Sequence, residues 1–289
     1  MSQRHHFVPK ILINGFLDPA SIDELGRNPF TWIYEKEKKV SKKKSPDNIL
    51  WERNLYTQYD ERNNENHSLE QFFSQKLEYP FAQFKKDHEN SLLSMDRSAL
   101  EKSNFSHLRM FFVAFIFWHW KRSFKFISRV KESYKQELLK NDGAEILVDY
   151  IDSKAMQNDI LDTLINIGNL YENQNAMRIL AKRNIIFTVI TNEKSSFINS
   201  DNPVLRTNAT GPNGFSYPST EVSMPLTSKI AISLIGENQK IQFRALHDRK
   251  EIRRINQSFA MNADKYIFGR NKELIDSLSK YIGEGGPIA

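Results

Sequence analysis

The stretch NIIFTVIT, residues Asn184–Thr191, marks the point where the chain changes from helix to strand. β-Branched and aromatic residues dominate this stretch, which favours a buried strand. Further runs of the same kind follow at 221–224, 229–235, 239–245 and 265–268, with helical patterns at 248–261 and 271–282. The C-terminal part of the chain is therefore predicted to mix strands with helices.

The N-terminal part repeats this mixture on a smaller scale. Residues Val8–Phe16 read as a short helix, because Pro9 suits a first helical turn and Gly15 suits a helix end. Residues Phe30–Tyr34 combine aromatic and β-branched side chains and predict a strand. Strands are thus expected at both ends of the chain.

The middle of the chain is expected to be helical. Ser68 starts a pattern of apolar residues at helical spacing, which Pro80 should kink or interrupt. A long helix is predicted from about 98 to 140, apolar on all faces between Phe111 and Trp120, and a further helical stretch covers 144–182.

Together these patterns predict an α+β fold with one mixed or antiparallel sheet, built from N- and C-terminal strands, and a central helical bundle packed against it. We expect one domain over residues 1–289. It comprises N-terminal strands and a short helix in 1–60, a helical region in 68–182, and C-terminal strands and helices in 184–289.

The composition limits the chemistry. The 289 residues include no cysteine, which excludes disulfides, thiolate zinc sites and a cysteine nucleophile. The net charge of +6 and the pI of about 9.2 mildly favour a polyanionic partner such as nucleic acid. The start of the chain lacks the apolar run of a signal peptide, and residues 111–120 are too few to span a bilayer. A cytoplasmic protein without membrane contact is expected.

Arg4, His5 and His6 form the first group of chemically interesting residues. Histidine titrates near neutrality and serves as a base, an acid or a metal ligand. The short helix after them would hold both imidazoles in place. The alternative is a packed histidine or an exposed tail.

The second group follows a predicted strand at Phe197–Ile198 and contains Ser200, Asp201 and Asn202. A carboxylate at the end of a strand is a common place for a catalytic group, because loops on a rigid sheet carry function. Asp and Asn also stabilise turns through hydrogen bonds to the local backbone, and this alternative explains the composition equally well.

Two further charged residues interrupt apolar helices. Glu78 lies beside Pro80 on an aromatic helix, where a buried carboxylate needs an Arg or His partner or shifts its pKa. Arg122 follows the most apolar helical turns and could reach an anion. A surface glutamate and a snorkelling surface arginine are the alternatives.

These groups coincide with the blocks by which the chain resembles the DUF4238 family, a bacterial domain of unknown function. The resemblance runs in order through nearly the whole chain, in Arg4–Lys10 with Phe16, Trp32–Tyr34, Asn54–Thr57, Leu77–Pro80, Trp120–Ser123, Phe197–Val204, Met224–Thr227, Asn256 and Tyr266–Phe268. It implies one domain and a shared polar site to which Asn256 is added, but it supplies no reaction.

A nuclease is the first functional hypothesis. His5, His6, Glu78 and Asp201 would be catalytic, with His6 and Asp201 as ligands of Mg²⁺ or Mn²⁺. Substrate would be bound by Arg4, Arg122, Ser200, Asn202 and Asn256. The His-His-x-x-Pro opening at His5 is similar to that of HNH nucleases, with Asn48 as the central Asn, but too many residues separate the two for a compact ββα-metal unit. By analogy with small bacterial proteins, such an enzyme would act in phage defence or as a toxin, with a partner protein.

Two other classes stay open. A metal-independent enzyme acting on a nucleotide or on NAD, by ADP-ribosyl transfer or glycosidic cleavage, would use Glu78 or Asp201 to stabilise an oxocarbenium-like state. The chain has neither a Walker sequence nor a GxGxxG motif, which disfavours ATP hydrolysis of that type. The third class is a non-catalytic binding module.

Overall fold

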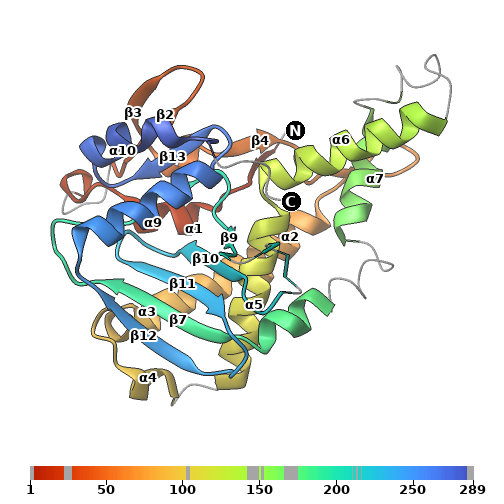
Figure 1. The fold of residues 1–289 in the computed structure, drawn as a ribbon. Helices are drawn as coiled ribbons and strands as arrows, with labels where there is room; N and C mark the ends of the chain where they lie inside the picture. The colour runs from red at the N-terminus through yellow and green to blue at the C-terminus, as the bar shows by residue number, and fades with distance from the viewer. Residues whose placement is uncertain are drawn as a thin grey trace.

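The computed structural model describes residues 3–22, 28–101, 105–141, 150, 153–165, 175–209, 211–212, 214–215 and 217–284. It confirms the α+β class, and most strands of the described residues lie in two sheets (Figure 1). The larger sheet has five strands in the order β12 (Ile241–Leu246), β7 (Asn184–Ile190), β11 (Ile230–Ile235), β10 (Glu221–Pro225) and β9 (Leu205–Thr207).

The stretch that begins at Asn184 forms β7, inside this larger sheet. It pairs in parallel with β12 and antiparallel with β11. Its residues alternate between the two faces of the sheet. Phe187 packs against Phe112 of a central helix, with ring centroids 5.4 Å apart, whereas Thr188 lies on the opposite face, in a cavity that it shares with Phe259 of helix α9 (Arg249–Asn262).

The smaller sheet unites the two ends of the chain, as expected. Its order is β3 (Val40–Lys44), β2 (Thr31–Glu35), β13 (Tyr266–Gly269) and β8 (Asn199–Ser200). The expectation of one sheet is corrected to two main sheets. Helix α9 lies between the two sheets (Figure 1). It contacts β8 of the smaller sheet and β9 of the larger sheet, and so keeps these strands from joining in a single sheet.

Two short strand pairs stand apart from the main sheets: β1 (Arg4–His6) with β4 (Trp51–Arg53), and β5 (Gln58–Tyr59) with β6 (Glu65–Asn66). The predicted short helix follows β1 as α1 (Lys10–Ile13) and a 3₁₀ turn, η1 (Asn14–Phe16). A Cβ atom at Gly15 would lie 2.8 Å from the Leu226 carbonyl oxygen, so only glycine allows this close approach. Two other 3₁₀ turns are η2 (Pro19–Ser21) and η3 (Pro46–Asn48).

The helix that starts at Ser68 contains a π-helical turn. It comprises α2 (Ser68–Phe73), the π turn η4 (Ser74–Glu78) and α3 (Tyr79–Leu93). Proline has no N–H, so Pro80 leaves the Lys76 carbonyl without its usual helical partner. The π turn lies just before Pro80, where such an irregularity is accommodated, and it carries Glu78.

The long helix expected from 98 to 140 is divided into α4 (Arg97–Glu101), α5 (Phe105–Lys121) and α6 (Phe124–Asn141). Ser123 explains the break between α5 and α6, because its Oγ accepts from the Phe126 N–H over 3.3 Å and so caps α6. Helix α5 is buried along most of its length, as predicted. No helix among the described residues is long and apolar enough to cross a membrane.

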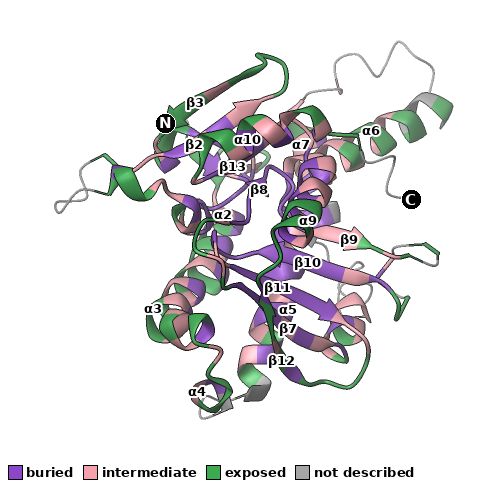
Figure 2. Ribbon diagram, turned by 60° about the vertical axis from the view of Figure 1, so that its left-hand side comes forward, coloured by how far each residue is buried: buried purple, intermediate pink, exposed green. Residues whose placement is uncertain are grey.

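Of the helical stretch predicted at 144–182, the structure describes α7 (Lys154–Ile165) and a helical segment at 175–181. Residues 144–149, 151–152 and 166–174 of this prediction lie outside the described residues. The last elements of the described residues are α10 (Lys272–Leu278) and η5 (Ser279–Tyr281), and α10 covers the smaller sheet. Buried residues concentrate in β7, β10 and β11 of the larger sheet and in β13 of the smaller one, while β3, α3 and α6 expose much of their surface (Figure 2).

Candidate functional site

A buried arginine joins three elements that are distant in sequence. Arg122 follows α5 and is only 1% exposed. Its Nη1 donates to Oε1 of Glu78 over 2.9 Å, and its Nη2 donates to the main-chain carbonyl of His6. Helix α5, the π turn and strand β1 therefore meet at one guanidinium. We call the residues around it, namely His5, His6, Tyr56, Glu70, Glu78 and Arg122, the Arg122 site.

Aromatic rings enclose the guanidinium. Its Cζ lies 4.5 Å from the ring centroid of Phe73 and 5.6 Å from that of Tyr56. The Tyr56 hydroxyl donates to the Arg122 carbonyl over 2.8 Å. Burial acts to lower the pKa of Arg122, but electrostatic interaction with Tyr56, Glu78 and Glu70 raises it above its ordinary value. The guanidinium therefore stays positively charged inside the protein.

His6 is held in one tautomer. Burial lowers its pKa, so the neutral imidazole dominates near pH 7. The ring is hydrogen-bonded to the main chain of Pro46, and its Nε2 has no partner among the described residues. Because proline has no N–H, the ring must donate from Nδ1 to the Pro46 carbonyl. Nε2 therefore carries the lone pair and has the form required of a general base.

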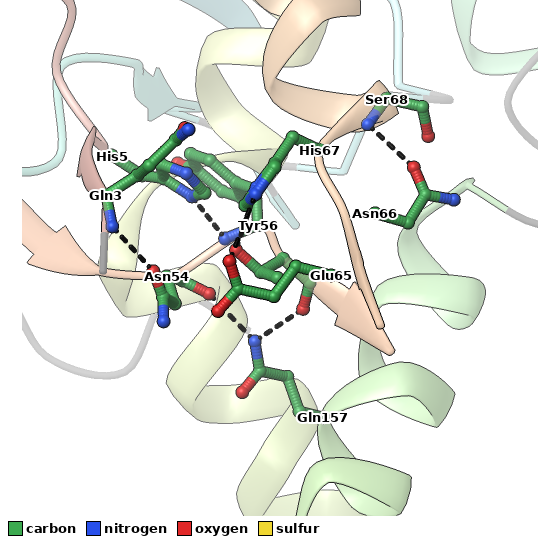
Figure 3. Close-up of polar contacts among 10 residues, drawn as sticks. Gln3, His5, Asn54, Tyr56, Glu65, Asn66, His67, Ser68 and Gln157 are labelled. Atoms are coloured by element: carbon green, nitrogen blue, oxygen red, sulfur yellow. Dashed lines mark hydrogen bonds and ion pairs between the residues drawn. The ribbon is translucent and has the colours of Figure 1, made fainter. Parts of the chain in front are cut away.

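His5 is held in the opposite tautomer. The main-chain N–H of Tyr56 donates to its Nδ1 over 2.9 Å, so the proton of the neutral ring resides on Nε2 (Figure 3). Burial, followed by the charges of His67 and Arg122, lowers the pKa of His5 to about 4. Consecutive residues of one strand thus present an imidazole N–H and an imidazole lone pair on opposite faces.

Sequence reasoning missed the partners of His5. The ring of His67 stands edge-on to it, with centroids 5.9 Å apart and an interplanar angle of 89°. The Nε2 of His67 lies 3.3 Å from Glu65, and its Nδ1 lies 3.3 Å from the Thr57 hydroxyl (Figure 3). Gln157 of α7 fixes this loop by donating to the carbonyls of Asn54 and Thr57. His67 follows a short polar hairpin that carries no sequence signal of its own.

Two other buried ionisable groups surround the guanidinium. Burial raises the pKa of Glu70 to about 7, and its Oε2 has no hydrogen-bond partner among the described residues. Burial, with the charge of Arg122, lowers the pKa of His119 to about 3. Near pH 7, Glu70 is partly protonated and His119 is neutral, so the ion pair of Arg122 is the one with Glu78.

The outer side of β1 carries cations. Strand alternation places Arg4 on the same face as His6. The Arg4 guanidinium lies 4.3 Å from the Trp51 ring centroid, and its Nη1 donates to Oδ1 of Asn48 over 3.3 Å. Lys10 pairs with Asp47 over 2.6 Å at the surface, and its charge acts to lower the pKa of His6. The positive charge of Lys10 therefore acts on the His6 ring, and Arg4 lies on the same face of the strand.

The turn after β8 forms a second network. Asp201 is 4% exposed and accepts the main-chain N–H groups of Asp264, Lys265 and Tyr266 over 2.9, 2.7 and 3.0 Å. Burial raises its pKa to about 6, against the effect of these three donors. Its carboxylate joins the turn to the start of β13, so Asp201 has a structural role.

Ser200, Asn202 and Asn256, which were also predicted to belong to the site, have similar structural roles. The Ser200 hydroxyl donates to the Asn202 carbonyl over 2.9 Å, and the Asn202 amide donates to the Asn262 carbonyl over 3.1 Å. Asn256, which is fully buried, accepts from the Ile198 N–H and donates to the Ser196 carbonyl. Their polar atoms bind main chain within the C-terminal half of the fold.

The structure therefore divides the predicted site. Arg4, His5, His6, Glu78 and Arg122 gather around β1, whereas Ser200, Asp201, Asn202 and Asn256 do not join them. Among the described residues, Asp201 forms no hydrogen bond or ion pair with His6, Glu78 or Arg122. The structure likewise forms no cluster of three His, Asp or Glu side chains fit for a metal within the described residues. The predicted His6 and Asp201 metal pair stays a prediction.

Comparison with protein families supports the resemblance that was described from the sequence. A family model described as a protein of unknown function (DUF4238) matches residues 4–273, which confirms the resemblance. No curated protein and no solved structure matches the chain.

Proposed function

The chain belongs to the DUF4238 family, and because membership supplies no reaction, we propose from the site itself that it hydrolyses phosphodiester bonds in DNA or RNA. The observation that carries this proposal is the tautomer of His6. Its neutral ring donates from Nδ1 to Pro46 and keeps a lone pair on Nε2. This is the state in which an imidazole removes a proton from a nucleophilic water.

The neighbours of His6 suit a phosphate substrate. Arg4 and Lys10 would neutralise charge on the phosphate oxygens as water attacks phosphorus and the leaving oxygen departs. Arg122 is a positioning residue, because its guanidinium is buried and holds the His6 carbonyl and the Glu78 carboxylate. The basic net charge of +6 favours a polyanionic substrate.

Access to His6 is limited in the substrate-free fold. The His6 side chain is partly exposed, and Glu78 exposes 25% of its side chain, so the site reaches the surface. The Nε2 atom itself is covered by neighbouring side chains. Binding of a phosphate therefore requires those side chains to move, as often happens when a catalytic hydrogen bond tightens only in the complex.

The test is cleavage of labelled single- and double-stranded DNA and RNA by the full chain, with Mg²⁺, with Mn²⁺ and with EDTA. The key variant is His6→Asn, because the Asn amide can replace the Nδ1 donor to Pro46 but lacks a base at the position of Nε2. We expect it to lower the cleavage rate by about 10²–10⁴-fold, the usual contribution of a general base. Its thermal unfolding should stay close to that of the wild type.

His247→Asn is the matched control, since His247 is an exposed histidine of the C-terminal half. It should cleave at the wild-type rate. Full activity in His6→Asn, or no cleavage under any of the metal conditions, contradicts the proposal. Consumption of NAD by the wild type would instead support the alternative of a nucleotide-processing enzyme, and a recovered partner protein without any activity would support a binding module.

The pH dependence of cleavage supplies a second readout. A general base must be unprotonated, so the rate should rise with pH through the pKa of His6, which burial places below 6.5. Activity at pH 7.5 should already be near its plateau. The proposed phage-defence role depends on this activity and is tested by infecting cells that express either the wild type or His6→Asn. The proposed cytoplasmic location is tested separately by fractionation of cells that express the protein.

A further inference from the structure

A cavity of about 400 Å³ lies where α6 meets β9 and the end of α9. Its volume is within the range of small-molecule sites. Helix α6 supplies Lys125, Arg129 and Tyr134, while Trp120 comes from α5 and Arg206 from β9. None of these side chains belongs to the Arg122 site, so the cavity is a separate feature of the fold.

The cavity is positively charged. Three cations, Lys125, Arg129 and Arg206, line it, against a single acidic residue, Glu137. Burial, followed by the charge of Arg129, lowers the pKa values of both Lys125 and Arg206. Cations that repel one another in a partly buried site favour the entry of an anion.

The same cavity offers aromatic surface. The Arg206 guanidinium lies 5.0 Å from the ring centroid of Trp120 and 5.2 Å from that of Phe215, so it packs beside both rings. Tyr134 contributes a further ring to the lining. Aromatic side chains and arginine planes are the surfaces on which nucleobases stack.

A buried amide oxygen completes the lining. Asn262 is 2% exposed and donates from Nδ2 to the carbonyls of Asn202 and Val204 over 2.8 and 3.0 Å. These bonds fix its amide plane. Its Oδ1 has no partner among the described residues, which is costly for a buried acceptor. An amino or hydroxyl group of a ligand would satisfy it.

We infer that this cavity binds a mononucleotide, with the phosphate at the cations, the base on the aromatic rings and a hydrogen-bond donor at Asn262. Positive charge alone would suit any anion, and aromatic surface alone would suit any apolar ring. Their combination with a fixed acceptor selects a ligand that has all three features. This inference does not depend on the proposed function, because it uses none of the residues assigned to hydrolysis.

Titration calorimetry of the full chain with AMP, GMP, CMP and UMP tests the inference, with adenosine and ribose 5-phosphate as ligands that lack the phosphate or the base. At least one mononucleotide should bind, and both truncated ligands should bind more weakly. Arg129→Gln should weaken binding about tenfold, as expected for the loss of a charged partner. Arg129 is exposed on α6, so this variant should fold normally.

Lys135→Gln is the control, because Lys135 lies on the same helix but not in the cavity. It should bind the mononucleotide as tightly as the wild type. Absence of binding by all four mononucleotides, equal binding of ribose 5-phosphate, or equal losses in Arg129→Gln and Lys135→Gln would each overturn the inference. A short oligonucleotide that displaces the mononucleotide from the wild type, but not from Arg129→Gln, would identify the end of a nucleic-acid strand as the natural ligand. An oligonucleotide that does not displace it would identify the free mononucleotide.

Discussion

The main-chain N–H of Tyr56 donates to Nδ1 of His5 over 2.9 Å, across 51 positions of sequence. Both residues are almost fully buried, and their rings stack with centroids 5.7 Å apart. This bond attaches β1 to the loop after β4 and sets the tautomer of His5. The imidazole of His5 therefore has a structural role in the fold.

The first prediction separates the contribution of this hydrogen bond from that of the packing of the His5 ring. His5→Asn can keep an acceptor for the Tyr56 N–H, because its amide oxygen lies near the position of Nδ1, whereas His5→Ala leaves a buried donor without a partner. We expect His5→Ala to lower the free energy of unfolding by at least about 1 kcal/mol more than His5→Asn does. Urea unfolding measures the difference. Equal losses would show that the ring packing, and not this bond, stabilises β1.

The second prediction concerns Arg122. Arg122→Met keeps an apolar stem against Phe73 but removes the charge that joins Glu78 to β1. Removal of one partner of a buried ion pair costs about 3–5 kcal/mol, so we expect a loss near this range in the free energy of unfolding. Arg62→Met, at an exposed position, is the matched control. If the two variants unfold at the same denaturant concentration, Arg122 does not hold the three elements together.

The third prediction is a pH dependence that arises from Glu70. Burial raises its pKa from 4.5 to about 7 in the folded state. The folded protein therefore binds this proton more tightly than the unfolded chain does. The stability that it contributes is fully present below pH 4.5 and is lost as the pH rises through 7.

Glu70→Gln removes this titration. Between pH 5 and pH 8, the stability of the wild type should fall relative to that of Glu70→Gln by about 2 kcal/mol, which follows from a pKa difference of two to three units. Chemical unfolding of both proteins at several pH values measures the difference. Glu61→Gln, at an exposed position, should show the pH dependence of the wild type. Parallel stability curves for the wild type and Glu70→Gln would refute the burial of a titrating carboxyl.

Much of the fold could be predicted from local patterns. The β-branched run at Asn184 and the aromatic run ending at Tyr34 formed strands, because both combine strand propensity with burial. The break between α5 and α6 was not predicted. Ser123 caps α6 in the folded chain, but a single serine within a helical pattern does not by itself indicate that a new helix begins there. The division into two sheets depends on where α9 packs, and an amphipathic helix does not specify which strands it separates.

The site was predictable only where a residue contradicted its local pattern. Glu78 on an aromatic helix required a cationic or imidazole partner, and Arg122 provides it. The chemical type of Asp201 could not reveal that three main-chain N–H groups from 264–266 would bind its carboxylate, because those contacts come from a strand more than 60 positions away. His67 was overlooked for the same reason, since its relation to His5 arises only in the folded chain.

The last prediction assigns Asp201 to structure. Asp201→Ala leaves three partly buried N–H groups without an acceptor, and we expect it to lower the free energy of unfolding by about 3 kcal/mol. Asp201→Asn keeps one acceptor oxygen, which can serve the N–H groups of Lys265 and Tyr266, but it places an amide donor near the Asp264 N–H. Its loss should therefore be smaller than that of Asp201→Ala.

The cleavage activity of Asp201→Asn distinguishes a structural role of Asp201 from a role as a metal ligand. If Asp201 only fixes the turn to β13, the folded fraction of Asp201→Asn should show the same cleavage rate and the same Mg²⁺ dependence as the wild type. Activity is compared after the folded fraction has been measured by urea unfolding under the assay conditions. A folded Asp201→Asn protein whose cleavage is abolished, or restored only by higher Mg²⁺, would return Asp201 to the catalytic site, because a structural carboxylate has no reason to change the response to a metal.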